Sequence, residues 1–361
     1  MKRTDLNLRH TARLIFIAAG LTASLGAVAE DSIFSFNGFG NQDYRESSAN
    51  SYEGADKRGT WEHNLLGLTV SAKLNDKARA WAELLASNAD GTAINWVFID
   101  YEINSNLKAH AGRVKLPFGI YNTDIDIKAL HLSATDPVVY DAAADMTHDA
   151  YSGVGLDWSN NAKNIVLEGF YGNFYTPGQA SPNTAIGPGF IDRRLIGGRL
   201  VYNTPVEGLR VMLSGNQSQV ESTAVTATLG QLGKENRVMY SVDYEAHGLD
   251  LKSEYSRHTV PALSGSSGLV LHGYYAQAGY NMEKWTPYVR YDYVTTDESR
   301  KSDPNYYQKS VLIGVGYKLQ DGLNLRAEEH FNRGYALPFA TNETATQLNW
   351  RTFIVSINFM F

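Results

Sequence analysis

The segment from Leu116 to Asp149 reads LPFGIYNTDIDIKALHLSATDPVVYDAAADMTHD. Apolar and polar residues alternate with the two-residue period of β-strands on both sides of it, and within it that period is lost. It is also too rich in Asp and Thr for a buried helix. Loops of this length without regular structure are uncommon in compact domains and are usually functional or disordered. Because this one carries Ile, Leu, Val and Tyr, we expect it to fold against another part of the chain.

Sixteen candidate strands with two-residue alternation surround this loop. In the last of them Phe353, Val355 and Ile357 share one face, whereas Thr352 and Ser356 share the other. An even number of two-faced strands is typical of a bacterial membrane barrel, whose lipid-facing side is apolar and whose interior is polar. The candidate strands are 33–44, 61–74, 77–88, 94–103, 106–115, 150–158, 164–173, 193–203, 209–218, 236–246, 249–258, 271–282, 285–295, 307–319, 322–332 and 350–361.

The connections between these strands alternate in length. Those after even-numbered strands are short turns, such as Asn75-Asp76 and His247-Gly248. A membrane barrel explains this alternation, because its short turns lie at the periplasmic rim and its long loops lie outside. A soluble sandwich has no reason to sort its loops in this way, and 116–149 becomes the third long loop. The long connections cover 45–60, 89–93, 116–149, 174–192, 219–235, 259–270, 296–306 and 333–349.

The composition favours strands, with 22 Tyr, 14 Phe, 6 Trp and 32 Gly. No long apolar run follows the first residues, so a membrane location would require a closed barrel, which satisfies every backbone polar group in lipid. Aromatic residues near strand ends, such as Trp61, Trp158 and Trp285, suit a membrane interface, although strand propensity alone also places them there. We predict an all-β, 16-stranded antiparallel transmembrane barrel with an inward-folded third loop.

The first residues have the three parts of a secretory signal peptide: a basic start with Lys2 and Arg3, an apolar run over 14–26, and the small residues Ala27 and Ala29. We expect residues 1–29 to be removed and residues 30–361 to form the barrel. An N-terminal membrane anchor is the weaker alternative, because the apolar run is short for a spanning helix.

The mature chain would be acidic. Residues 1–29 hold four basic residues and one acid, so without them the formal charge falls from −6 to −9. This balance argues against a nucleic-acid partner, which would need a basic face. The sequence has no Cys, which excludes disulfides and a thiolate metal site.

Two local features resemble the outer-membrane porins of Gram-negative bacteria. The segment GRVKLPFG, from Gly112 to Gly119, resembles the passage from a strand into the third external loop, and the final Phe361 resembles the signal read by the barrel-assembly machinery. The resemblance is closest to the sixteen-stranded trimeric type, which includes general diffusion porins and relatives of the phosphate-selective O and P porins. It implies a bacterial outer-membrane location, contact with lipid and lipopolysaccharide, a homotrimer and a constricting third loop.

Charged residues divide between the predicted constriction loop and the predicted pore wall. Acids on a loop inside a low-dielectric barrel would favour cations. Asp136 precedes Pro137 and is the better candidate for a turn role. The constriction candidates are Asp124, Asp126, Lys128, Asp141 and Asp145. The wall candidates, directed inward by strand parity or by a bulge near Gly112, are Arg79, Lys108, His110, Arg113, Lys115, Arg199, Arg210, Arg290 and Arg326. Inward acids are expected to pair with many of these bases, and the remaining bases to face the loop acids.

These patterns predict a porin for passive diffusion of ions and small hydrophilic solutes, with a mild preference for cations. No nucleophile elbow, zinc-binding helix or phosphate loop occurs, so we expect no enzyme activity, cofactor or metal. Two alternatives stay open. A channel specific for a small anion, such as an organic acid or phosphate, would use Arg113, Lys115 and the wall arginines, although the acidic loop argues against phosphate. A structural envelope barrel would be plugged and would not conduct.

Overall fold

The computed structural model describes residues 33–361 except 53, 89–90, 142–143, 145, 177–189, 223–230, 261–267 and 338–346. The predicted signal peptide, residues 1–29, lies outside the described residues, and so does Asp145 of the predicted constriction loop. In the described part of the chain, no helix has both the length and the apolar character to cross a membrane.

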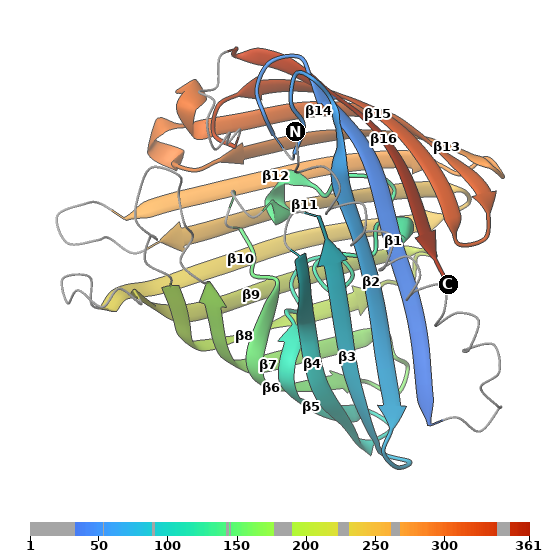
Figure 1. Ribbon diagram of the computed structural model, residues 1–361. Coiled ribbons are helices and arrows are strands. Elements are labelled where there is room, and N and C mark those ends of the chain that lie inside the picture. The colour runs from blue at the N-terminus through green and yellow to red at the C-terminus, as the bar shows by residue number, and fades with distance from the viewer. Residues whose placement is uncertain are drawn as a thin grey trace, which may run out of the picture.

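The chain forms a closed antiparallel barrel of sixteen strands, in which β1 pairs with both β2 and β16 (Figure 1). This confirms the predicted fold class and strand number. The strands are β1 (Phe34–Ser47), β2 (Thr60–Lys73), β3 (Ala78–Ser87), β4 (Gly91–Asn104), β5 (Leu107–Lys115), β6 (Ala150–Ser159), β7 (Ile165–Thr176), β8 (Phe190–Asn203), β9 (Leu209–Ser222), β10 (Gln231–Ala246), β11 (Leu249–Val260), β12 (Leu269–Tyr280), β13 (Trp285–Thr295), β14 (Tyr307–Gln320), β15 (Leu323–Gly334) and β16 (Asn349–Met360). The short helices are η1 (Lys128–Leu130), η2 (Val138–Tyr140), η3 (Glu298–Arg300) and η4 (Pro304–Tyr306).

Most predicted turns join neighbouring strands as expected. His247 and Gly248 link β10 to β11 with φ values of +54° and +80°, the left-handed conformations that a two-residue hairpin turn requires. The connection predicted over 89–93 differs. Ser87 pairs with Gly91, so β4 begins earlier than its hydrophobic pattern indicated, and only residues 88–90 separate it from β3.

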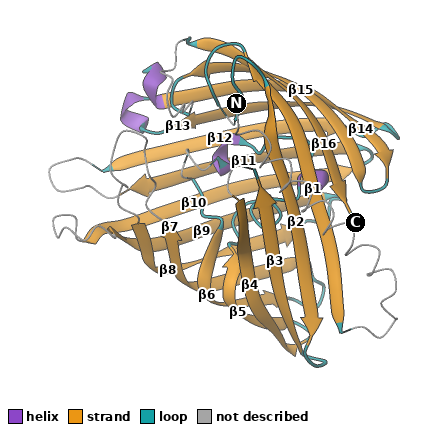
Figure 2. Cartoon of the chain, viewed as in Figure 1, coloured by secondary structure: helices purple, strands orange, loops and turns teal. Residues whose placement is uncertain are grey.

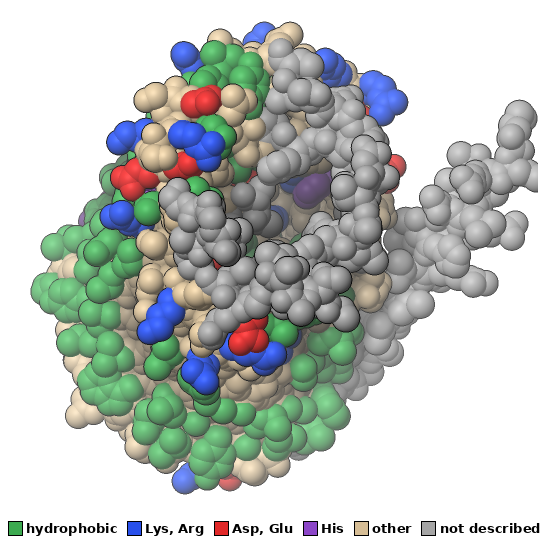
Figure 3. All heavy atoms as spheres, turned by 90° about the vertical axis from the view of Figure 1, so that its left-hand side faces the viewer, with side chains coloured by type: hydrophobic (Ala, Val, Ile, Leu, Met, Phe, Trp, Pro, Cys, Tyr) green, Lys and Arg blue, Asp and Glu red, His purple; other side chains and the backbone are tan. Residues whose placement is uncertain are grey.

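The two faces of each strand have opposite environments. In β16, Phe353 and Ile357 are 41% and 37% exposed, whereas Thr352 and Ser356 are buried. Since Phe353 and Ile357 face away from the lumen, the outer surface of the barrel is apolar, as lipid contact requires. Figure 3 shows hydrophobic side chains spread over this outer surface and charged side chains gathered near one mouth.

The loop 116–149, with η1 and η2, lies inside the barrel (Figure 2). Its apolar side chains pack on apolar side chains of the inner wall, so the hydrophobic core of the molecule lies between loop and wall. The loop contributes Leu116, Phe118, Tyr121, Val138, Val139, Tyr140 and Met146. The wall contributes Phe170 of β7, Leu195 of β8, Met239 of β10, Leu271 and Tyr275 of β12, and Val294 of β13.

Candidate functional site: the pore constriction

Glu254 of β11 is the main acceptor for the first half of the loop. Its carboxylate accepts hydrogen bonds from the Ile120 amide at 2.8 Å and from the Tyr140 hydroxyl at 2.5 Å. Ser241 and Tyr275 on the neighbouring strands donate to the same carboxylate. Burial, and the charge of Glu254 beside it, raise the pKa of Tyr140 well above its ordinary value, so this hydroxyl remains a donor.

Two glycines allow the chain to leave β5 and approach the wall. Gly119 has a φ of +66°, and a Cβ added there would lie 2.7 Å from a carboxylate oxygen of Glu254. Gly112 has a φ of +138°, and an added Cβ would lie 2.7 Å from the Cα of Phe98. Both positions therefore require glycine for conformation and for space. These are the first and last residues of the GRVKLPFG segment.

Arg290 and Arg326 lie on the wall and bind the second half of the loop from the wall side. Arg290 is 2% exposed, and its guanidinium donates to the Ser133 hydroxyl at 2.6 Å and to the Thr135 carbonyl at 2.8 Å. Arg326 is 6% exposed and donates to the carbonyls of His131 and Leu132. The two arginines predicted to line the pore thus lie beneath the loop and bind its backbone.

Two wall acids accept hydrogen bonds from backbone amides of the same half-loop. Glu328 accepts from the Ala134 amide at 2.5 Å, and Asp292 accepts from the Val138 amide at 3.1 Å. Strand parity directs both acids into the barrel. Two-residue periodicity gives the face on which a side chain lies but not the atom it contacts, so the sequence does not show that these acids bind the loop. A buried amide without an acceptor costs about 1–3 kcal/mol, so these carboxylates stabilise the docked loop.

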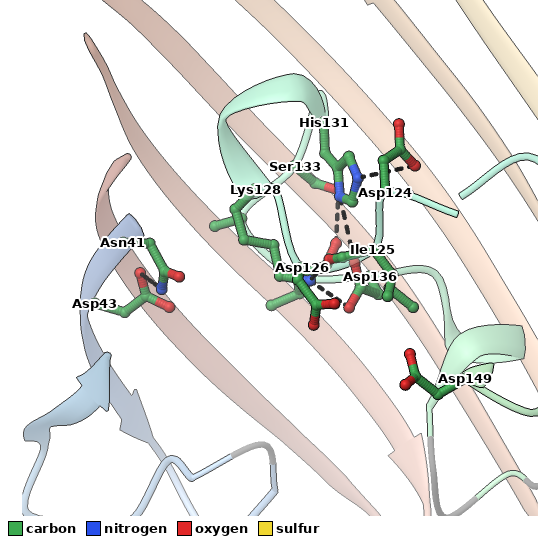
Figure 4. Close-up of polar contacts among 12 residues, drawn as sticks. Asn41, Asp43, Asp124, Ile125, Asp126, Lys128, His131, Ser133, Asp136 and Asp149 are labelled. Carbon is green, nitrogen blue, oxygen red and sulfur yellow. Dashed lines mark hydrogen bonds and ion pairs between the residues drawn. The ribbon is translucent and has the colours of Figure 1, made fainter. Parts of the chain in front are cut away.

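Figure 4 labels the loop acids Asp124, Asp126, Asp136 and Asp149. Their exposed fractions differ, and the side chains of Asp124 and Asp149 are 39% and 40% exposed. Asp126 is less exposed, at 21%, and lies 2.6 Å from Lys115, which also pairs with Asp149. Asn95 donates to Asp126 at 2.9 Å. Lys115 is therefore neutralised by two carboxylates.

Asp136 forms a buried cluster with Lys128 and His131 within the loop. Its carboxylate pairs with the Lys128 ammonium, and a second oxygen lies 3.4 Å from His131 Nδ1. Burial alone would raise the pKa of Asp136, but Lys128 and His131 outweigh it and hold that pKa well below its ordinary value. The sequence suggested a local turn role for Asp136, whereas its side chain ties two parts of the loop together.

The remaining loop candidate, Asp141, accepts a hydrogen bond from the Tyr52 hydroxyl at 2.8 Å. Tyr52 lies in the connection between β1 and β2, so this contact joins the loop to the opposite part of the barrel rim. Together with the anchors on β8 to β15, it holds the loop across the lumen.

Three predicted wall residues lie on the lumen side away from the loop anchors. Arg79 donates to Ser71 Oγ at 3.1 Å and lies over the Trp81 ring, 5.5 Å from its centroid. Lys108 Nζ is 3.5 Å from Asp100. His110 Nε2 is 2.7 Å from the Tyr151 hydroxyl.

Two further wall candidates, Arg199 and Arg210, are paired with acids of neighbouring strands. Arg199 pairs with Glu168 at 2.6 Å and also donates to the Gly119 carbonyl at 2.7 Å, so it too holds the loop. Arg210 pairs with Asp243 at 2.5 Å.

Arg113 differs from its predicted inward position. No register shift occurs at Gly112 on either side of β5, so the expected bulge is not present. Arg113 pairs in register with Val97 and Ser152, both exposed on the outer face, and its Nε donates to the Asn95 carbonyl at 2.7 Å.

One group of described side chains brings three possible metal ligands together: His148, Asp192 and Glu235, all buried, with ligand atoms within 4.8 Å of one another. Arg237 lies 2.7 Å from the Glu235 carboxylate, and a guanidinium beside that carboxylate disfavours a second cation. His148 Nε2 lies 2.9 Å from Asp192, which links the end of the loop to β8. We interpret this group as an ion-pair anchor.

A model of the Gram-negative porin family matches residues 15–334. The chain belongs to the Gram-negative porins. With its closed barrel, this porin is an outer-membrane channel. No curated protein matches it by sequence.

Solved outer-membrane proteins share the fold of this porin. OmpT of Vibrio cholerae is 12% identical with a TM-score of 0.59, covering 92% of this chain and 100% of its own. OmpF of Salmonella typhi, in complex with daunomycin, is 10% identical with a TM-score of 0.62. The match covers 92% of this chain and 99% of OmpF. The channel DcaP of Acinetobacter baumannii is 13% identical with a TM-score of 0.60, covering 90% and 97%. At these identities the likeness concerns the fold alone.

Replacing the main loop acceptor should release the loop. In Glu254→Ala the hydroxyls of Tyr140 and Tyr275 lose their carboxylate acceptor, and the Ile120 amide keeps only the Tyr140 hydroxyl. Each unsatisfied buried donor costs about 1–3 kcal/mol. We expect a larger and more variable single-channel conductance and faster trypsin cleavage after Lys128. The control is Glu245→Ala, because Glu245 is an exposed acid near the end of β10. Wild-type conductance and cleavage in Glu254→Ala would contradict this role.

Proposed function

We propose that this porin passes ions and small hydrophilic solutes by passive diffusion and mildly prefers cations. The observation that carries the proposal is the charge of the loop inside the lumen. Its described part holds five aspartates and one lysine, Lys128. Two of those acids, Asp124 and Asp149, are also well exposed. Acids on a loop within a low-dielectric barrel concentrate a negative potential where the channel is narrowed.

The arrangement of the wall cations supports the same preference. Arg290 and Arg326 are buried against loop carbonyls, and Arg199 pairs with Glu168. None of these three arginines therefore offers a free positive charge to a solute. These wall bases hold the loop instead of facing its acids across the pore, and the side chains of Asp124 and Asp149 are 39% and 40% exposed.

The same contacts weigh against a channel specific for a small anion. Lys115 is already paired with Asp126 and Asp149, and Arg113 has an outward register. These two residues were the main candidates for an anion site. The porin family and fold also support a channel rather than an enzyme. A non-conducting envelope barrel would show no current in the experiment below.

We also propose a homotrimer. One of the similar structures is a trimer form of OmpT from Vibrio cholerae, with a TM-score of 0.59 and 12% identity. The outer face of β3 carries Ala80, Ala82 and Ala86, with Leu84 between the last two, and these small residues would allow close subunit contact. The mass in detergent, measured by light scattering, should equal three chains, and a single-chain mass would contradict this assembly. Contact with lipopolysaccharide and recognition of Phe361 by the assembly machinery stay predictions from the sequence.

Removing the two exposed acids should weaken cation preference. In the double variant Asp124→Asn, Asp149→Asn, the negative potential at the loop falls, so the potassium-to-chloride permeability ratio should move towards that of free diffusion. The measurement is the reversal potential of the purified protein in a planar bilayer under a KCl gradient.

The matched control is Asp76→Asn. Asp76 lies in the turn between β2 and β3 with its side chain 95% exposed, away from the loop. Its removal should leave the ratio unchanged. A wild-type protein that prefers chloride, or a double variant with the wild-type ratio, would overturn the charge assignment.

A further inference from the structure

Three aromatic side chains cluster on the lumen side of β3 and β4. The rings of Trp81 and Phe98 are stacked with centroids 6.5 Å apart, and Trp96 lies 5.5 Å from Phe98. All three rings are only half-buried. They border a cavity of about 340 Å³ between this wall and the loop residues Pro117 and Thr123.

The lumen face of a membrane barrel is normally polar, so half-buried aromatic rings there need an explanation. Only Phe98 packs against the core beneath the loop. Trp81 and Trp96 are not part of that core. Trp81 donates from its indole nitrogen to Asp100 at 3.1 Å, and the Arg79 guanidinium lies 5.5 Å from the centroid of its ring. The cluster therefore offers an apolar surface to a solute that enters the cavity.

Polar groups of both charges surround this apolar surface. Lys108 lies 3.5 Å from Asp100, and the Lys108 side chain is 41% exposed. On β6, Asp157 lies 3.6 Å from His110 and is 36% exposed. The remaining acid, Glu168, pairs with Arg199. The rim thus supplies many hydrogen-bond donors and acceptors without a strong excess of one charge.

A solute that fits this surface has an apolar face, a rim of hydroxyl groups and no net charge. A pyranose ring has these properties. Its C–H groups can lie on the negative face of an aromatic ring. Its hydroxyls can donate to carboxylates and accept from an ammonium group. The cavity is near the lower end of the roughly 300–1,000 Å³ range of small-molecule sites, which suits a solute of one ring.

We propose that this cavity binds a neutral pyranose sugar on its way through the channel. A charged aromatic solute fits less well, because cations and carboxylates both surround the cavity and neither charge is in strong excess. The inference rests on the proposed function, since a sugar reaches the cavity through a conducting pore. It adds a solute class that the acidic loop alone does not specify.

The test records single-channel current of the purified protein in a planar bilayer with glucose, sorbitol or benzoate. Glucose should interrupt the current reversibly at millimolar concentration. Sorbitol has the hydroxyls but no ring, so the same interruption of the current should need at least about a tenfold higher concentration. Aromatic contacts are worth on the order of a tenfold change in affinity. Benzoate should have no effect.

Variants of Trp81 separate ring stacking from pore size. Trp81→Leu should weaken the glucose effect about tenfold, whereas Trp81→Phe keeps an aromatic face and should retain most of it. Trp285→Leu is the matched control, because Trp285 is 52% exposed on the outer surface and paired with Tyr317. Its glucose response should equal that of the wild type.

Glucose binding in detergent, followed by tryptophan fluorescence, separates this inference from the proposed function. Saturable binding that is weakened in Trp81→Leu supports the site even if the protein does not conduct. Conduction without a glucose effect overturns the site and leaves the channel function standing. Equal effects of glucose and sorbitol, a stronger effect of benzoate, or an unchanged response of Trp81→Leu would each overturn it as well.

Discussion

A loop buried inside a barrel must find hydrogen-bond partners for its backbone, because water and regular structure supply too few of them there. The inner wall of this porin provides them. Glu254 and Glu328 accept from loop amides, and Arg290 donates to a loop carbonyl. Each unsatisfied buried group would cost about 1–3 kcal/mol, so the docked position of the loop depends on these charged side chains.

This requirement divides the lumen into two sides. From β8 to β15, charged wall residues face the loop and are occupied by it, and apolar side chains such as Met239 and Leu271 pack beneath it. From β3 to β6 the wall holds the loop through Asn95 and Lys115, which both contact Asp126, and Trp81 and Lys108 face the cavity. Under the two proposals above, selectivity and solute recognition would have different locations: the acids of the loop would act on ions, and the aromatic wall would act on a ring-shaped solute.

The sequence predicted the parts of this structure that depend on local periodicity and loop length. These are the sixteen strands, their apolar outer face and the position of 116–149 as the third long loop. It could not predict which wall side chain meets which loop atom, because inward facing is compatible with many partners. Arg290 was therefore expected at the open pore, although it lies under the loop. Arg113 was misplaced because a bulge was expected near Gly112, whereas β4 and β5 stay in register there.

Cross-linking the loop to the wall tests its docked position most directly. A Cβ added to Gly273 on β12 would lie 3.1 Å from a methyl carbon of Val139, which is fully buried in η2. The chain has no cysteine, so the double variant Val139→Cys, Gly273→Cys contains one possible disulfide. We predict that it forms under mild oxidation and leaves single-channel conductance unchanged. Failure to form, or a conductance that changes on oxidation, would contradict a loop held at this wall.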